Sequence, residues 1–114
     1  MGENRSTRRA TNEVVFRLVN EEIEALNIEV QGSTAAGSMD IVCECEDIAC
    51  AERLAVTIDA YEHVRASPLL FFVTPGHERK DIERVVKTTE SYYVVSKNPR
   101  SASGKAAVAT DPRS

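Results

Sequence analysis

Three cysteines lie within eight residues of one another and form the pattern C-x-C-x4-C at Cys43, Cys45 and Cys50. A histidine, His77, follows at the end of a Pro-Gly-His tripeptide, with 26 residues between it and the last cysteine. Three thiolates and one imidazole are the ligand set of a closed tetrahedral zinc site. An odd, bunched set of cysteines does not suit the disulfide framework of a secreted domain. We therefore predict a zinc site with the ligands Cys43, Cys45, Cys50 and His77; another thiophilic metal, or buried or redox-active thiols without a metal, are the alternatives.

The spacing of the first two cysteines favours a metal over a disulfide. Residues i and i+2 of a strand point to the same face with Cα atoms about 6.6 Å apart, which is the upper limit for a disulfide. Two sulfurs bound to one zinc ion need to approach only to about 3.8 Å. Three acidic residues lie beside the cysteines, Glu44, Glu46 and Asp47, and like-charge repulsion from them should raise the thiol pKa values. We therefore expect a bound metal ion to be what keeps the cysteines deprotonated.

The position of His77 leads to a prediction about topology. It comes directly after the apolar run 69–73 and a Pro-Gly turn, so backbone geometry fixes its place. If this strand runs parallel to the cysteine-bearing strand in one sheet, their C-terminal ends coincide and the imidazole reaches the thiols; antiparallel neighbours would separate the groups by about 17 Å. His63 is the rival fourth ligand, but helical geometry places it opposite the apolar face of its own segment, and we expect it to be exposed.

The elements around this site predict an α+β or small α/β fold, in which helices flank a short sheet of three or four strands clipped by the metal. We expect helices at 12–31, 58–66 and 79–89, a small-residue linker at 32–38, and strands at about 39–45, 54–56, 69–74 and 92–97. Thr57 should cap the second helix. A hairpin between residues 82 and 97 is the alternative to the third helix, disfavoured because Glu90 and Ser91 lack the Gly or Asn of a tight turn.

The first helix has an apolar stripe that we expect to face the core. Thr11 or Asn12 should be its N-cap, and the stripe consists of Phe16, Val19, Ile23, Leu26 and Val30. The stripe resembles a short coiled-coil seam, but fewer than three heptads favours a helix packed on its own domain.

The charge is unevenly distributed along the 114 residues. The total of −4 divides into −9 over residues 12–96, +2 over the first eleven residues and +3 over the last eighteen. We predict one zinc-binding domain at 12–97, a disordered basic arm at 1–11 and a disordered tail at 98–114, because both ends are poor in large apolar residues. An acidic body disfavours nucleic-acid binding, which needs clustered Lys and Arg.

No segment predicts export or membrane insertion. The first ten residues contain three arginines and no apolar run of the kind that forms a signal-peptide core. The longest apolar stretch, 69–73, is far below the roughly 20 residues that span a bilayer. We expect a cytoplasmic protein without a membrane partner, in a compartment where thiols stay reduced.

Enzyme signatures are missing from the sequence. The segment after His77 lacks the second histidine of H-E-x-x-H, and neither a P-loop nor the zinc-deaminase pattern occurs. A closed Cys3His site also leaves no coordination position for water or substrate. The sequence therefore favours a structural zinc site in a protein-interaction or regulatory module, with an acidic surface that attracts a basic protein partner. A thiol-based redox or zinc sensor is the first alternative, a zinc-dependent hydrolase the second and RNA binding through the basic ends the third.

Several short motifs resemble those of a family of small uncharacterised bacterial proteins with a C-E-C…C…P-G-H pattern. The likeness covers about residues 12–97 and lies in Asn12-Glu13, Phe16-Arg17, Val19-Asn20-Glu21, Cys43-Glu44-Cys45, Cys50, Tyr61-Glu62, Val64-Arg65, Phe72-Val73, Pro75-Gly76-His77, Ile82-Glu83-Arg84-Val85-Val86, Tyr93-Val94-Val95 and Lys97. The resemblance implies a bacterial cytosolic protein in which the cysteines and His77 act as one unit. It implies no substrate.

Overall fold

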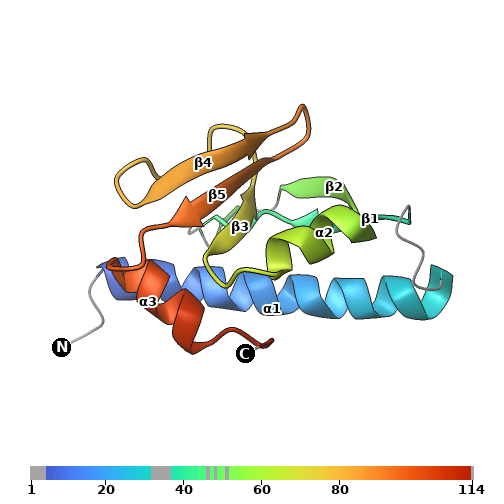
Figure 1. Ribbon diagram of the computed structural model, residues 1–114, viewed down its shortest axis with the longest axis horizontal. Coiled ribbons are helices and arrows are strands. Elements are labelled where there is room, and N and C mark those ends of the chain that lie inside the picture. The colour runs from blue at the N-terminus through green and yellow to red at the C-terminus, as the bar shows by residue number, and fades with distance from the viewer. Residues whose placement is uncertain (1–4, 32–36, 46, 48, 51, 114) are drawn as a thin grey trace.

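The computed structural model describes residues 5–31, 37–45, 47, 49–50 and 52–113, which form three helices and two small antiparallel sheets (Figure 1). The helices are α1 (Arg5–Gln31), α2 (Ile58–Arg65) and α3 (Ala102–Ala109), and the strands are β1 (Ser38–Val42), β2 (Arg53–Thr57), β3 (Leu70–Val73), β4 (Glu83–Thr88) and β5 (Tyr93–Lys97). α1 runs along the length of the molecule on one side, with α2 and both sheets on the other. The predicted α+β class is confirmed, although two sheets replace the single expected sheet. No helix among the described residues is long and apolar enough to cross a membrane.

The two-stranded sheet shows an alternation of buried and exposed residues along both of its strands. β1 and β2 pair antiparallel, with Met39 opposite Val56 and Ile41 opposite Leu54. All four of these side chains are buried, whereas their neighbours along each strand are more exposed. One face of the sheet therefore packs on the core, as expected for a half-buried antiparallel pair.

The three-stranded sheet has the order β3-β5-β4, all antiparallel. Its strand β3 confirms the strand expected at 69–74, and the burial of Phe71, Phe72 and Val73 shows that both of its faces are covered. Phe72 stacks on Tyr61 of α2 with ring centroids 5.7 Å apart. α2 itself begins as predicted, because the Thr57 side chain accepts a hydrogen bond from the Ala60 amide.

The predicted helix at 79–89 is wrong, and the alternative hairpin is present. β4 pairs with β5, and a bulge between Val85 and Lys87 adds one residue to β4. Ile82, Val85 and Val86 show the i, i+3, i+4 spacing of a helix, but Val86 is the extra residue of a bulged strand. The turn needs no glycine because the Thr89 hydroxyl accepts hydrogen bonds from the amides of Ser91 and Tyr92 and donates one to the Tyr92 carbonyl.

α1 differs from the prediction in its start and in the face that it buries. It begins at Arg5, several residues before the expected cap at Thr11 or Asn12. Its buried face carries the polar side chains of Glu13, Arg17, Asn20 and Glu24 at the helical spacing i, i+4, i+7, i+11. Much of the predicted core stripe is instead at the surface: Val19, Leu26 and Val30 are exposed, and Phe16 and Ile23 are half-buried.

Ion pairs and cation–π contacts explain why this polar face can be buried. The Lys97 ammonium contacts the carboxylates of Glu13 and Glu83. Arg17, Arg65 and Lys97 each place their charged group within 5.1 to 5.4 Å of the centre of the Phe71 ring. Buried charges are tolerated when they are paired and hydrogen-bonded, and here they join α1 to the three-stranded sheet.

The expected disordered tail contains a helix that packs on α1. Ser101 caps α3 by accepting a hydrogen bond from the Gly104 amide. The Arg17 guanidinium of α1 donates hydrogen bonds to the Ala107 carbonyl and to the Thr110 hydroxyl. The helix buries small residues, and a Cβ at Gly104 would lie only 2.0 Å from the carbonyl oxygen of Asn98. Close backbone approach, and not large apolar side chains, therefore holds this segment.

Residues 1–4 of the expected N-terminal arm, residues 32–36 of the expected linker, and Ser114 lie outside the described residues.

Candidate metal centre

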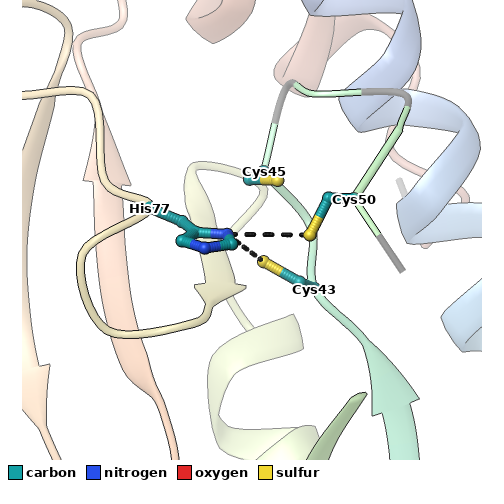
Figure 2. A group of neighbouring side chains, drawn as sticks. All are labelled: Cys43, Cys45, Cys50 and His77. Atoms are coloured by element: carbon teal, nitrogen blue, oxygen red, sulfur yellow. Dashed lines mark hydrogen bonds between the residues drawn. The ribbon is translucent and has the colours of Figure 1, made fainter. Parts of the chain in front are cut away.

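Two segments, one after β1 and one after β3, bring the predicted ligands together (Figure 2). Cys43 and Cys45 follow the end of β1, and Cys50 follows them through a short loop. His77 follows β3 through a turn in which its amide donates a hydrogen bond to the Thr74 carbonyl, 2.9 Å away. Gly76 makes this turn possible, because its φ of 93° is a conformation that other residues rarely adopt.

The four candidate donor atoms lie within 4.8 Å of one another. The Nδ1 atom of His77 is 3.7 Å from the Cys43 sulfur and 3.6 Å from the Cys50 sulfur. Zinc bound by three thiolates and one imidazole would place nitrogen and sulfur about 3.6 Å apart and two sulfurs about 3.8 Å apart. The distances from Nδ1 to the sulfurs of Cys43 and Cys50 already match these values, and the longest separation in the group must shorten by about 1 Å. The chemistry and the spacing of the donor set fit a thiophilic metal ion.

The site is open on one side. Cys43 and Cys45 are buried, while Cys50 and His77 are partly exposed. The rival His63 lies on α2 with its side chain 81% exposed, and its Nδ1 atom faces the Asp59 carbonyl oxygen of its own helix at 3.3 Å. Its predicted exposure is confirmed, and it does not belong to the cysteine group.

The predicted parallel pairing of the two strands is wrong, although their ends do meet. β1 and β3 belong to different sheets. The segment after β1 reaches β3 through the Glu44 amide, which donates a hydrogen bond to the Phe72 carbonyl at 2.8 Å. The Thr74 amide donates another to the Cys43 sulfur at 3.1 Å. These two contacts bring His77 to the thiols without a shared sheet.

Glu44 is an anchor of the site. It is fully buried between the two cysteines, and its two carboxylate oxygens accept hydrogen bonds from the Asn20 side chain at 2.8 Å and from the Phe72 amide at 2.9 Å. Asn20 also brackets Val42, because it accepts a hydrogen bond from the Val42 amide and donates one to the Val42 carbonyl. α1, the end of β1 and β3 are thereby fixed to one another immediately beside the thiols.

The thiol pKa values follow from contacts among the sulfurs and from burial. Hydrogen bonds from the Cys45 side chain and from Thr74 lower the pKa of Cys43. The same contact with Cys43, together with burial, raises the pKa of Cys45, and burial raises the pKa of Cys50. These contacts therefore make the Cys43 thiol more acidic than the thiols of Cys45 and Cys50. A metal bound here would replace the remaining thiol protons and the hydrogen bonds among the sulfurs.

The predicted role of the acidic neighbours needs correction. Glu44 is occupied by Asn20 and Phe72, and the exposed Asp47 accepts a hydrogen bond from the Ala49 amide. Glu46 lies outside the described residues. Hydrogen bonds among the sulfurs and burial, and not repulsion by these carboxylates, are the main causes of the shifts in the thiol pKa values.

Two residues that support the site were not predicted from the sequence. Asn20 stood in a helix whose apolar stripe was expected to face the core, so nothing in the pattern marked it as buried. Thr74 ends the apolar run before Pro-Gly-His, and its place just ahead of a ligand is the only signal that could have indicated its contact with Cys43.

Comparisons with protein-family models, with curated proteins and with solved structures find no match for this chain.

Proposed function

We propose that Cys43, Cys45, Cys50 and His77 bind one zinc ion and that this ion has a structural role in a cytoplasmic protein-interaction module. The observation that carries the proposal is the convergence of the four donor atoms within 4.8 Å from segments that follow β1 and β3. Thiolate and imidazole ligands in this ratio select zinc among the common cellular metals. Four protein ligands fill a tetrahedral sphere, which leaves no position for a substrate and disfavours a hydrolase.

The structural role is supported by what the ion would join. The Cys50 amide donates its hydrogen bond to the Asp47 carbonyl within the same loop, whereas Cys43 is tied to other segments by the Glu52 carbonyl and by the Thr74 amide. A bound ion would tie the cysteine loop to the turn at His77. In a small domain with a thin core, such a link adds folding free energy directly.

X-ray absorption at the metal edge tests the coordination. Zinc-loaded protein should show three sulfur atoms at about 2.3 Å and one nitrogen at about 2.0 Å. Four sulfurs, or an oxygen among the ligands, would contradict the proposed ligand set. Loss of the nitrogen in His77→Ala, and its retention in His63→Ala, would assign the imidazole.

The interaction role is supported by the charges around the site. Asp47 lies between two ligands and Glu52 is bonded to Cys43 through its backbone, and both side chains are exposed. Together with the net charge of −9 over residues 12–96, they favour a basic partner. Proteins captured by the wild-type chain should no longer bind the Asp47→Lys/Glu52→Lys variant. They should still bind the control variant Asp59→Lys/Glu90→Lys, which changes the same number of exposed carboxylates elsewhere. Equal loss in both variants, or no captured protein, would count against this role.

A second candidate, a peroxide sensor, is favoured by the partial exposure of Cys50, whose sulfur lies within 4.8 Å of the sulfurs of Cys43 and Cys45. Two thiolates would give two electrons to hydrogen peroxide, which takes up two protons and leaves as two waters, while one disulfide forms and the zinc ion is released. If an equimolar amount of peroxide releases zinc from wild type but not from Cys50→Ser, the sensor function is favoured. Zinc release only at a large excess of peroxide would favour the structural role.

A further inference from the structure

The outer face of α1 is apolar and uncovered in the described structure. Val15, Leu18, Val19, Leu26 and Val30 are between 41% and 85% exposed, and helical spacing places them on one side of the helix. The opposite side carries the buried Glu13, Arg17, Asn20 and Glu24. This helix is therefore inverted relative to an ordinary surface helix, which turns its apolar stripe inward.

Contacts with the domain force this orientation. The Glu13 carboxylate contacts the buried Lys97 ammonium, and the Arg17 guanidinium donates to the Pro68 and Ala107 carbonyls. Rotating the helix to bury the valines and leucines would break these contacts and leave charged groups without partners. The apolar stripe must then be covered from outside, because contiguous exposed apolar patches of this kind mark interaction sites.

The charge along α1 indicates what covers it. Arg5, Arg8 and Arg9 lie in its first two turns, whereas the exposed Glu22 and Glu29 lie in its last three. A second copy lying antiparallel would set the basic end of each helix beside the acidic end of the other, and a parallel copy would set like charges together. Two-fold symmetry then produces the same favourable contact twice.

We infer that the outer face of α1 is a self-association surface, on which two copies of the chain pair through antiparallel α1 helices centred near Leu18 and Val19. This inference goes beyond the proposed function and does not depend on the metal. A 27-residue helix is about 40 Å long. One narrow helix–helix strip lies at the low end of specific interface sizes, so the dimer should dissociate in the micromolar range.

Sedimentation of the zinc-loaded full chain between 1 and 500 µM tests the inference, with the metal content of each sample measured separately. Wild type should shift from monomer to dimer. Val19→Glu/Leu26→Glu should remain monomeric, because it places charge within the apolar strip of the pair, while Val86→Glu, at a valine of similar exposure on β4, should dimerise like wild type. Circular dichroism confirms that each variant is folded.

Orientation is tested by Glu29→Gln, which removes one exposed charge from the acidic end. In the antiparallel pair two attractions are lost and the dissociation constant should rise about fivefold. In a parallel pair a repulsion is removed and the dimer should strengthen, which would overturn the arrangement. A wild-type chain that stays monomeric at 500 µM, or a dimer unchanged in Val19→Glu/Leu26→Glu, would overturn the inference altogether.

Discussion

The structure predicts that replacing a single carboxylate oxygen of Glu44 lowers the free energy of unfolding. In Glu44→Gln an amide nitrogen replaces one of two carboxylate oxygens that both accept hydrogen bonds. Because each oxygen faces a donor, either orientation of the new amide sets two donors against each other. Asn20 cannot turn to relieve this, since its oxygen and nitrogen are both committed to Val42.

The magnitude follows from the hydrogen bonds that each substitution removes. Glu44→Gln removes one hydrogen bond and leaves a buried donor unpaired, which costs about 2 kcal/mol. Glu44→Ala removes both hydrogen bonds and should cost about 4 kcal/mol. Domains of this kind have free energies of unfolding of about 5 to 15 kcal/mol, so the alanine variant should lose about a quarter or more of its stability.

Urea denaturation followed by far-ultraviolet circular dichroism, with zinc in excess, measures these losses. The matched control is Glu52→Gln, which removes an exposed carboxylate on the same loop and should change stability by less than about 0.5 kcal/mol. A Glu44→Gln variant as stable as wild type, or no more affected than Glu52→Gln, would refute the role of Glu44 as an anchor.

Three other predictions concern the packing of α1 and α3. Burial raises the pKa of Glu24 to about 7, which is above its unfolded value near 4.5, so the contribution of Glu24 to the free energy of unfolding should fall as pH rises from 4.5 to 7. In unfolding experiments at several pH values, Glu24→Gln should lose this part of the pH dependence. A difference in stability between the variant and wild type that stays constant across that range would contradict the prediction. Arg17→Lys should destabilise the fold by about 2 kcal/mol and speed amide hydrogen exchange in α3, because lysine cannot make the forked contacts of the guanidinium; slow exchange in α3 would speak against that contact. Gly104→Ala should lower the thermal midpoint of unfolding strongly, because the new Cβ would meet the Asn98 carbonyl. At the exposed position 109, Ala109→Gly should cost only about 1 kcal/mol of helix propensity. Similar midpoints for the two variants would show that α3 does not dock as described.

Local patterns predicted much of the fold and the composition of the candidate site. The alternation in β1 and β2, the Thr57 cap and the apolar run of β3 all have direct sequence signals. The pattern C-x-C-x4-C and Pro-Gly-His likewise indicated a metal-ligand set without any knowledge of tertiary structure, because residue type alone limits the chemistry.

The features that were missed depend on backbone irregularities or on long-range contacts. The bulge in β4 imitated a helical period, and a threonine side chain replaced the expected turn residue. The buried face of α1 could not be predicted, because its charges are tolerated only next to Lys97, Glu83 and Phe71, which lie far away in the sequence. α3 escaped notice because its docking depends on small residues that hydrophobicity does not mark.

A metal ion bound by three cysteines and one histidine is the central feature proposed for this protein. Native mass spectrometry combined with elemental analysis, on wild type, His77→Ala and His63→Ala, tests this most directly. We predict one zinc ion per chain in wild type and in His63→Ala, and a lost or much weakened ion in His77→Ala. A wild-type protein that binds no metal when zinc is supplied, or a His77→Ala variant that keeps its zinc at full affinity, would contradict the proposed site.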